Sequence, residues 1–187
     1  MRHSLYSYAL VALAATAVAP AAAQDAAAPP TETAASGVGV FGALGLGVAS
    51  SGFGGVLSLS VHSSRNAFVA RASGASEFTI LSPSDTAEDF AFLYGRVRER
   101  GAGWLRAAVG PALVRVTRDG DPYDCVLFFC LYELEESYHP GLAFQAEAVW
   151  TPAGILGLGA TAFANVNPEM SYAGLALGVH LGRVRRR

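Results

Sequence analysis

Cys125 and Cys130 are the only two cysteines of the chain and stand in the stretch YDCVLFFCLYE, separated by four large apolar residues. A pair this close in sequence can form a disulfide, bind a metal ion or act as a redox thiol pair. Zinc sites need further Cys or His ligands at fixed spacings, and redox pairs usually have CxxC spacing at a helix N-terminus. The spacing therefore favours a disulfide, provided that the chain reaches an oxidising compartment.

The sequence also holds residue types that suit nucleophilic catalysis. Glu135, Glu136, Ser137 and His139 follow one another closely, and a serine, a histidine and a carboxylate can together form a nucleophilic set. Such a set works only when its members are held in a fixed geometry. Because all four residues lie in the stretch 118–140, which we expect to be a loop, nothing in the sequence indicates that geometry.

Isolated charged or titratable residues inside apolar stretches form a third group, which comprises Arg96, Arg106, Glu147 and His180. Their chemistry depends on the elements that carry them, because a buried charge is stable only beside a partner. The four histidines of the chain are scattered, and none stands at a diagnostic metal-ligand spacing. No metal or other cofactor is predicted.

The N-terminal segment indicates the compartment. Residues 1–23 combine an early cation, an apolar run and small residues before an expected cleavage after Ala23, which is the pattern of a secretory signal peptide. The apolar run is shorter than the about 20 residues of a spanning helix. Residues 24–36 are rich in Ala, Pro and Thr and are predicted to be a disordered leader, followed by one domain over 37–184 and a basic tail over 185–187.

Beyond residue 36, the dominant pattern is alternation with a period of two. In MSYAGLALGVHLG, large apolar residues occupy one phase while Gly, Ala and His180 occupy the other, and the same split recurs in GVGVFGALGLGV and AGILGLGATAFAN. This period is typical of β-strands. Eight strands are predicted, over residues 37–49, 53–62, 66–73, 90–98, 103–117, 141–150, 154–165 and 171–183.

The predicted connections differ in length. Those after the second, fourth and sixth strands are tight, whereas those after the third and fifth are long. An even number of strands with short turns at one end and longer loops at the other is the layout of an all-β, eight-stranded antiparallel up-and-down transmembrane barrel. The second phase is too poor in polar residues to face water, so the large apolar phase is expected to face lipid. The expected membrane-facing residues are Leu44, Leu46, Leu156, Leu158, Leu175, Leu177, Val179, Leu181 and, in an interfacial girdle, Trp150.

The same argument directs charged residues of the strands into the lumen, because a charge that faces the bilayer midplane costs about 2 to 4 kcal/mol. Arg96, Arg106, Glu147 and His180 are therefore predicted to form a lumenal charge cluster, with His62 at a similar depth. Arg106 and Glu147 lie on facing strands and are expected to pair. A plugged lumen is favoured over a gate or ion path, since interior ion pairs need no substrate to explain them.

The signal peptide, the eight alternating strands and the glycine-rich lumenal phase resemble the small eight-stranded outer-membrane barrels of Gram-negative bacteria, the porin-like and outer-membrane-protein-A-like group. FLYGRV and the run WTPAGILGLGATAFANVNPEMSYAGLALGVHLG with its closing GRVR look like a narrower group of uncharacterised exported barrel proteins from Bacteroidetes and related phyla. Unlike many outer-membrane barrels, the sequence ends in Val184 and three arginines where an aromatic residue is common. The resemblance implies location in the cell outer membrane and supplies no catalytic motif.

Function is then expected to lie in the surface loops, with outer-membrane lipid and an unknown surface ligand of the 118–140 loop as partners. Nucleic acid is not expected, since the net charge is −2 and no basic stripe is interleaved with aromatics. One alternative is a soluble or periplasmic barrel that carries a small apolar ligand, which would turn the apolar phase inward. A second is a lipid-A-modifying enzyme, because some small outer-membrane barrels act on lipid A with His, Ser and acidic groups.

A Cys125–Cys130 bridge would fix the tip of the 118–140 loop. The apolar segment 126–129 between the two cysteines has three possible explanations. It extends the barrel hairpin above the membrane, it dips into the lipid headgroups, or it is an exposed patch for a partner. We expect the hairpin extension first and partner contact second.

Overall fold

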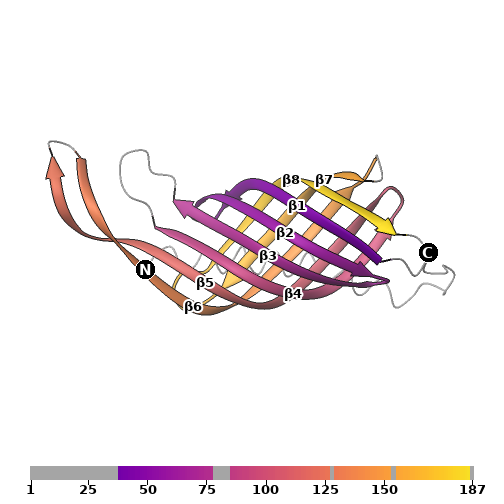
Figure 1. Ribbon diagram of the computed structural model, residues 1–187, viewed down its shortest axis with the longest axis horizontal. Coiled ribbons are helices and arrows are strands. Elements are labelled where there is room, and N and C mark those ends of the chain that lie inside the picture. Colours follow the sequence, from indigo (N-terminus) through magenta and orange to yellow (C-terminus); the bar gives the residue numbers. More distant parts are fainter. Residues whose placement is uncertain (1–37, 78–84, 127–128, 153–154, 186–187) are drawn as a thin grey trace.

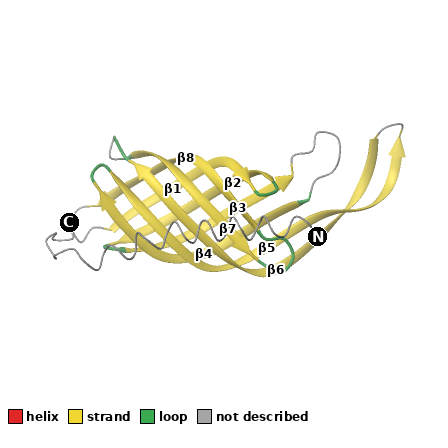
Figure 2. Cartoon of the chain, turned by 180° about the vertical axis from the view of Figure 1, so that it is seen from behind, coloured by secondary structure: helices red, strands yellow, loops and turns green. Residues whose placement is uncertain are grey.

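The computed structural model describes residues 38–77, 85–126, 129–152 and 155–185, which form eight β-strands (Figure 1, Figure 2). The predicted signal peptide (1–23), the leader (24–36) and the last two residues of the basic tail lie outside these ranges. The strands are β1 (Val38–Ala49), β2 (Gly52–Ser63), β3 (Asn66–Glu77), β4 (Thr86–Arg100), β5 (Gly103–Val126), β6 (Phe129–Trp150), β7 (Leu156–Val166) and β8 (Tyr172–Arg185).

The eight strands close into a barrel. Each strand pairs antiparallel with the next one in sequence, and β1 also pairs with β8 in one continuous register from Val38 opposite Arg185 to Ala49 opposite Gly174. A closed sheet leaves no edge with unpaired N–H and C=O groups, which is the condition for β-structure in lipid. The predicted eight-stranded antiparallel up-and-down barrel is confirmed. Among the described residues, no helix is long and apolar enough to cross a membrane.

Alternate side chains of each strand point outward and into the lumen. In β4, Phe90, Phe92 and Tyr94 are at least half exposed, whereas Ala91 and Leu93 between them are buried. All eight strands contribute exposed large apolar side chains, so the apolar outer surface extends around the whole barrel. Inward side chains such as Ala91 and Leu93 pack in small apolar clusters that fill the lumen.

Glycines of the inward phase make room for aromatic rings in this narrow barrel. A Cβ atom added at Gly174 would lie 2.5 Å from the ring of Phe163, and one added at Gly54 would lie 2.8 Å from the same ring. Both distances are shorter than real carbon contacts, so glycine at these two positions is what allows Phe163 to be buried. A few large rings thus fill the lumen where the wall carries no side chain.

The two ends of the barrel differ, as the connection lengths predict. We call one the turn end, because it carries the β2–β3, β4–β5 and β6–β7 connections. The first two of these are tight turns in which Ser64 and Gly101 have φ values of 55° and 58°. The opposite end, the loop end, carries the β3–β4, β5–β6 and β7–β8 connections together with the tight β1–β2 turn.

The largest departure from the sequence prediction lies at the loop end. The stretch 118–140, expected to be a loop, is mostly β-strand, so that β5 has 24 residues and β6 has 22, against 11 to 15 in the other strands. Pairing continues from Arg118 opposite Glu135 to Val126 opposite Phe129, with register shifts between Asp119 and Asp124. The result is a two-stranded hairpin that projects past the barrel rim (Figure 1).

We call residues 118–126 and 129–141 the protruding hairpin. β4 pairs with β5 only up to Thr117, and β7 pairs with β6 only from Leu142 onward, so within the described ranges no third strand pairs with these residues. An extension of the barrel hairpin is the first of the three explanations that the sequence analysis gives for the apolar segment 126–129. Residues 127 and 128 of that segment lie outside the described ranges. The sequence here shows no clear alternation, yet it forms strands. This is possible because strand formation depends on the pairing partner more than on intrinsic propensity.

Candidate functional site

Two clusters of polar side chains lie in the lumen, and the first is near the turn end. Arg106 on β5 and Glu147 on β6 are opposite each other in the strand register. Their side chains form an ion pair, with 2.5 Å between Arg106 Nη2 and Glu147 Oε2 and only 1% of each side chain exposed. His62, at the end of β2, lies 3.1 Å from Arg106 Nη1 through its Nε2 atom. Gln145 donates from Nε2 to Glu147 Oε1 at 2.6 Å.

The indole of Trp104 is the centre of this cluster. The rings of His62 and His180 lie edge-on to it at centroid distances of 5.0 and 5.5 Å. The guanidinium of Arg106 lies 5.2 Å from the indole centroid, which is within reach of a cation–π interaction. We call these residues the turn-end cluster; its members are His62, Trp104, Arg106, Gln145, Glu147 and His180.

Several polar atoms of the turn-end cluster have no hydrogen-bond partner among the described residues. They are Trp104 Nε1, Arg106 Nε, Gln145 Oε1 and His180 Nδ1, all on side chains that are more than nine-tenths buried. Buried polar atoms of this kind usually bond to internal water when the protein supplies no partner. The turn-end cluster is therefore tied together by its ion pair and its rings, while part of its hydrogen-bonding capacity is left for water.

Arg96 does not belong to this cluster, although the sequence predicted it there. Its side chain is exposed on the outward face of β4, in the phase of Phe92 and Tyr94, while Leu93 and Val97 point into the lumen. The prediction failed because both phases of β4 hold large apolar residues, so the alternation alone did not decide the direction. The aromatic residues occupy the outer surface, and Arg96 lies beyond them toward the turn end, where a long side chain can reach the interface.

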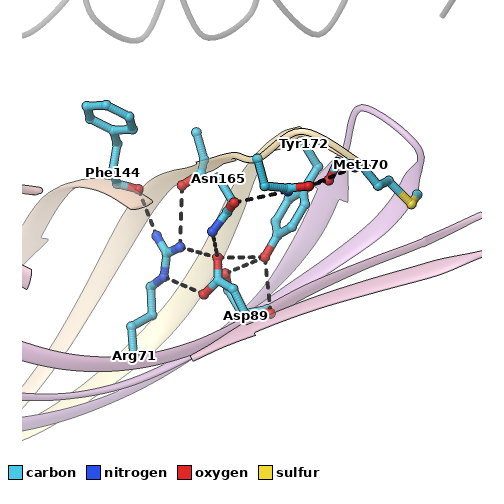
Figure 3. Close-up of polar contacts among 9 residues, drawn as sticks. Arg71, Asp89, Phe144, Asn165, Met170 and Tyr172 are labelled. Atoms are coloured by element: carbon cyan, nitrogen blue, oxygen red, sulfur yellow. Dashed lines mark hydrogen bonds and ion pairs between the residues drawn. The ribbon is translucent and has the colours of Figure 1, made fainter. Parts of the chain in front are cut away.

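The second polar cluster lies nearer the loop end and was missed by sequence reasoning (Figure 3). Arg71 on β3 and Asp89 on β4 form a two-pronged ion pair, with Nε to Oδ1 at 3.2 Å and Nη2 to Oδ2 at 2.5 Å, and neither side chain is exposed. Arg71 also donates to backbone carbonyls on the opposite wall, from Nη1 to Phe144 at 2.7 Å and from Nη2 to Ala164 at 3.3 Å.

Asp89 is the acceptor on which several elements converge. Tyr172 on β8 donates its hydroxyl proton to Asp89 Oδ2 at 2.8 Å, and Asn165 on β7 donates from Nδ2 to the same oxygen at 2.9 Å. The Tyr172 hydroxyl also lies 3.0 Å from the hydroxyl of Ser73. We call Arg71, Ser73, Asp89, Asn165 and Tyr172 the loop-end cluster.

Asn167 connects the loop-end cluster to the β7–β8 connection. Its Nδ2 donates to Asn165 Oδ1 at 3.1 Å and to the Met170 carbonyl at 2.9 Å. Its Oδ1 accepts from the backbone N–H groups of Glu169 and Met170 at 2.9 and 2.8 Å, which folds the connection back on itself. The hydrogen bonds therefore run without interruption from the β3 wall to this loop.

The loop-end cluster crosses the lumen, because Arg71 on β3 reaches β6 and β7. A signal for it was present in the sequence. Arg71 is in the inward phase of β3 with Val69 and Ser73. Asp89 is in the inward phase of β4, directly before the outward-facing Phe90. The predicted fourth strand began at Phe90, which left Asp89 in a loop and removed the partner that would have drawn attention to Arg71.

The residues predicted to face a membrane are all on the outer surface. Leu46 and Leu177 are 72% and 75% exposed, and Trp150, beside the β6–β7 connection, is 58% exposed. The others are also exposed, namely Leu44, Leu156, Leu158, Leu175, Val179 and Leu181. These nine side chains therefore do not line the lumen, as a soluble carrier of an apolar ligand would require.

The two cysteines lie opposite each other near the tip of the protruding hairpin, where the backbone pairs Cys125 with Cys130. Their side chains lie outside the described part of the structure. Directly opposed residues of an antiparallel pair have Cα atoms about 4.5 to 5.5 Å apart, which is within the range that a disulfide spans. The register is thus compatible with the expected bridge, which stays a prediction.

The candidate catalytic residues belong to β6 instead of a loop. Ser137 and His139 point to the same side of the strand, with 3.0 Å between Ser137 Oγ and His139 Nε2. Glu136 points to the other side and pairs with Arg115 at 3.2 Å. Among the described residues, no carboxylate contacts His139, so the serine and histidine lack the group that would orient the imidazole. The described residues also hold no group of three or more His, Cys, Asp or Glu able to bind a metal ion.

Comparisons with known proteins agree with the barrel fold. No protein-family model matches the sequence, and no curated protein matches it. The crystal structure of Neisserial surface protein A aligns with a TM-score of 0.53 and 12% identity, over 78% of this chain and 95% of the other. Ail, the attachment invasion locus protein of Yersinia pestis, in complex with the heparin analogue sucrose octasulfate, aligns with a TM-score of 0.51 and 11% identity, over 78% and 98%.

Both of these proteins are small eight-stranded outer-membrane barrels. At such low identity the likeness shows the fold alone. The narrower resemblance of the sequence to exported barrel proteins of Bacteroidetes is not supported by these comparisons.

Proposed function

We propose that the chain is an outer-membrane barrel with a closed lumen, which acts as an anchor and presents the protruding hairpin at the cell surface as a binding element. The observation that carries this proposal is the length of β5 and β6, which continue past the rim while every other strand ends near it (Figure 1). The outer membrane would hold the barrel, and the hairpin would reach beyond the lipid headgroups.

The outer surface supports the membrane location. Exposed large apolar side chains occur on all eight strands, and soluble monomers rarely expose apolar surface on that scale. The shortest strand has 11 residues, and a tilted transmembrane strand needs about 9 to 11. The alternative of a soluble carrier for an apolar ligand fits poorly, because it requires the leucines to point inward.

The two lumenal clusters support an anchor over a channel. The loop-end cluster joins β3 and β4 to β6, β7 and β8 across the lumen, and the turn-end cluster brings His62, Trp104 and Arg106 together with Glu147 and His180. Eight-stranded barrels have interiors just wide enough for side chains to fill. The buried ion pairs Arg71–Asp89 and Arg106–Glu147 lie in that interior, which supports a closed lumen.

The charge of the protruding hairpin indicates the class of partner. Between Arg115 and Glu136 the sequence has six acidic residues and two arginines, so a cationic polypeptide is the partner that this surface fits. Among the described residues, no further strand pairs with the outer edges of its two strands, so an extended segment can add there. A polyanion such as the one bound by Ail does not fit, because the acidic residues would repel it.

Whole-cell thiol labelling tests the placement of the hairpin. A membrane-impermeant maleimide should not label intact cells, because Cys125 and Cys130 are expected to be bridged, and should label them after mild reduction. The chain has only these two cysteines, so a variant with both replaced by serine gives the background from the thiols of other cell-surface proteins. Labelling that needs outer-membrane permeabilisation would place the hairpin on the periplasmic side, and labelling without reductant would show that the bridge is absent.

A shortened hairpin tests the binding role. Replacing residues 119–134 by Asn-Gly would join Arg118 to Glu135, which are already register partners, through a two-residue turn. Cells displaying the full chain should bind a fluorescent oligolysine peptide in a salt-dependent manner, and cells with the shortened chain should lose that binding. Heat-modifiable gel migration would show whether both barrels are folded. Equal peptide binding by the two folded chains would contradict the proposed role.

A further inference from the structure

An open groove of about 890 Å³ lies on the outer wall near the turn end, across strands β5 to β8. Small residues form its floor, among them Ala148 on β6 and Ala160 on β7, which are opposite each other in the register. Leu105, Trp150 and Leu177 form its sides and are exposed. Because Ala148 and Ala160 have small side chains, the surface is hollowed between these larger residues.

The groove suits a hydrocarbon chain. From β5 to β8 it spans three strand spacings, which is about 14 Å at about 4.8 Å per spacing. Its volume falls within the range of small-molecule sites, about 300 to 1,000 Å³. The named side chains are apolar apart from the indole N–H of Trp150, so a polar ligand would find few partners along the groove.

One end of the groove is cationic. Arg100, at the end of β4, lines it, and Arg96 and Arg98 are exposed in the same outward phase of that strand. Glu99 is the single acidic residue between Arg96 and Arg100. Arginine donates several N–H groups in a planar array that matches phosphate oxygens. An apolar channel that ends at arginine has the charge distribution of a site for an anionic lipid.

We propose that this groove binds an anionic phospholipid, with one acyl chain over Ala148 and Ala160 and the phosphate beside Arg100. The proposal rests on the proposed membrane location, and it adds a specific lipid site to the general contact with the bilayer. At the turn end, Trp150 lies at the depth where an interfacial indole meets the headgroup region.

The test uses the full mature chain reconstituted into vesicles of phosphatidylethanolamine and phosphatidylglycerol in a 3:1 ratio, then released with mild detergent for native mass spectrometry. The retained lipid should be enriched in phosphatidylglycerol several-fold above its share of the vesicle. Arg100→Gln should remove the enrichment, and Ala160→Phe, which fills the groove, should reduce the total lipid retained.

Matched controls separate this site from general charge and bulk effects. Arg115→Gln removes a partly exposed arginine from β5 near the loop end, away from the groove, and Ala70→Phe adds a ring to an exposed alanine on β3. Both should behave as the unchanged chain. Retention in proportion to the vesicle composition, or equal loss in the controls, would overturn the lipid site. Failure of the unchanged chain to float with the vesicles would instead count against the proposed membrane location.

Discussion

The loop-end and turn-end clusters each place one buried arginine beside one buried carboxylate, but their polar atoms are paired to different extents. In the loop-end cluster, Asp89 accepts from Arg71, Asn165 and Tyr172, and Arg71 also reaches two carbonyls. In the turn-end cluster, four polar atoms on Trp104, Arg106, Gln145 and His180 find no hydrogen-bond partner in the part of the chain that the structure describes.

This difference indicates two roles for buried charge in one lumen. A fully paired network holds opposite walls of the barrel at fixed distances and excludes water. A partly paired network surrounded by rings keeps its charges neutralised while admitting water, and it depends less on any one contact. The loop-end cluster should therefore carry more of the stability of the barrel than the turn-end cluster.

The largest effect is expected from Asp89→Asn. The change leaves the Arg71 charge buried without its carboxylate and gives three donors an amide in place of a strong acceptor. We expect the free energy of unfolding to fall by about 3 to 5 kcal/mol, which is typical of broken buried ion pairs. Urea titration in detergent micelles, followed by heat-modifiable gel migration, measures this. Glu88→Gln, at an exposed position one residue earlier, is the control and should change stability by less than about 0.5 kcal/mol.

A smaller effect is expected from Glu147→Gln in the turn-end cluster. Arg106 loses its counter-charge but keeps the Trp104 ring and the contact with His62, and its Nε has capacity for water. The free energy of unfolding should fall by about 1 to 3 kcal/mol in the same titration. A loss equal to that of Asp89→Asn would show that the two clusters contribute equally and would remove the distinction drawn between them.

Amide replacements compare the clusters with similar changes in side-chain volume. Asn165 has both its amide atoms paired, whereas the Oε1 atom of Gln145 has no partner. Asn165→Leu should lower the free energy of unfolding by about 2 kcal/mol, because it removes one hydrogen bond that Asp89 accepts and one that Asn167 donates. Gln145→Met should cost less than about 1 kcal/mol, since only the bond to Glu147 is lost. The reverse order in urea titration would contradict the difference in pairing.

The barrel itself could be predicted from the sequence because its physical determinants are local and repeated. The alternation in β1, β7 and β8 separates leucine and valine from glycine so clearly that strand number and direction follow from it. The cross-strand contact of Arg106 with Glu147 could also be anticipated, since both residues lie in well-defined strands at matching distance from tight turns.

The outward position of Arg96, the loop-end cluster and the protruding hairpin could not be predicted, because they depend on contacts between segments that are distant in sequence. Arg96 was misplaced because both phases of β4 hold large apolar residues. Asp89 and Arg71 lie 18 residues apart and are joined with Asn165 and Tyr172 only after the barrel closes. Residues 118–140 form strands because β5 and β6 pair with each other. Their polar sequence, which contains glycine and proline, does not predict that pairing.

The smallest effect is expected outside the lumen, at Ser137→Ala. Ser137 and His139 are half-buried on β6 near the rim, where water can replace the lost hydrogen bond between them. The free energy of unfolding should change by less than about 0.5 kcal/mol. The same variant tests the enzymatic alternative, because a hydroxyl that acts as a nucleophile is essential to catalysis while a surface hydrogen bond is not. Mass spectra of lipid A from cells carrying the unchanged chain, the variant and no chain should be identical. A lipid A species that requires the chain and disappears with Ser137→Ala would show that the rim pair is catalytic, and the polar residues at the rim would then have to be considered beside the two lumenal clusters.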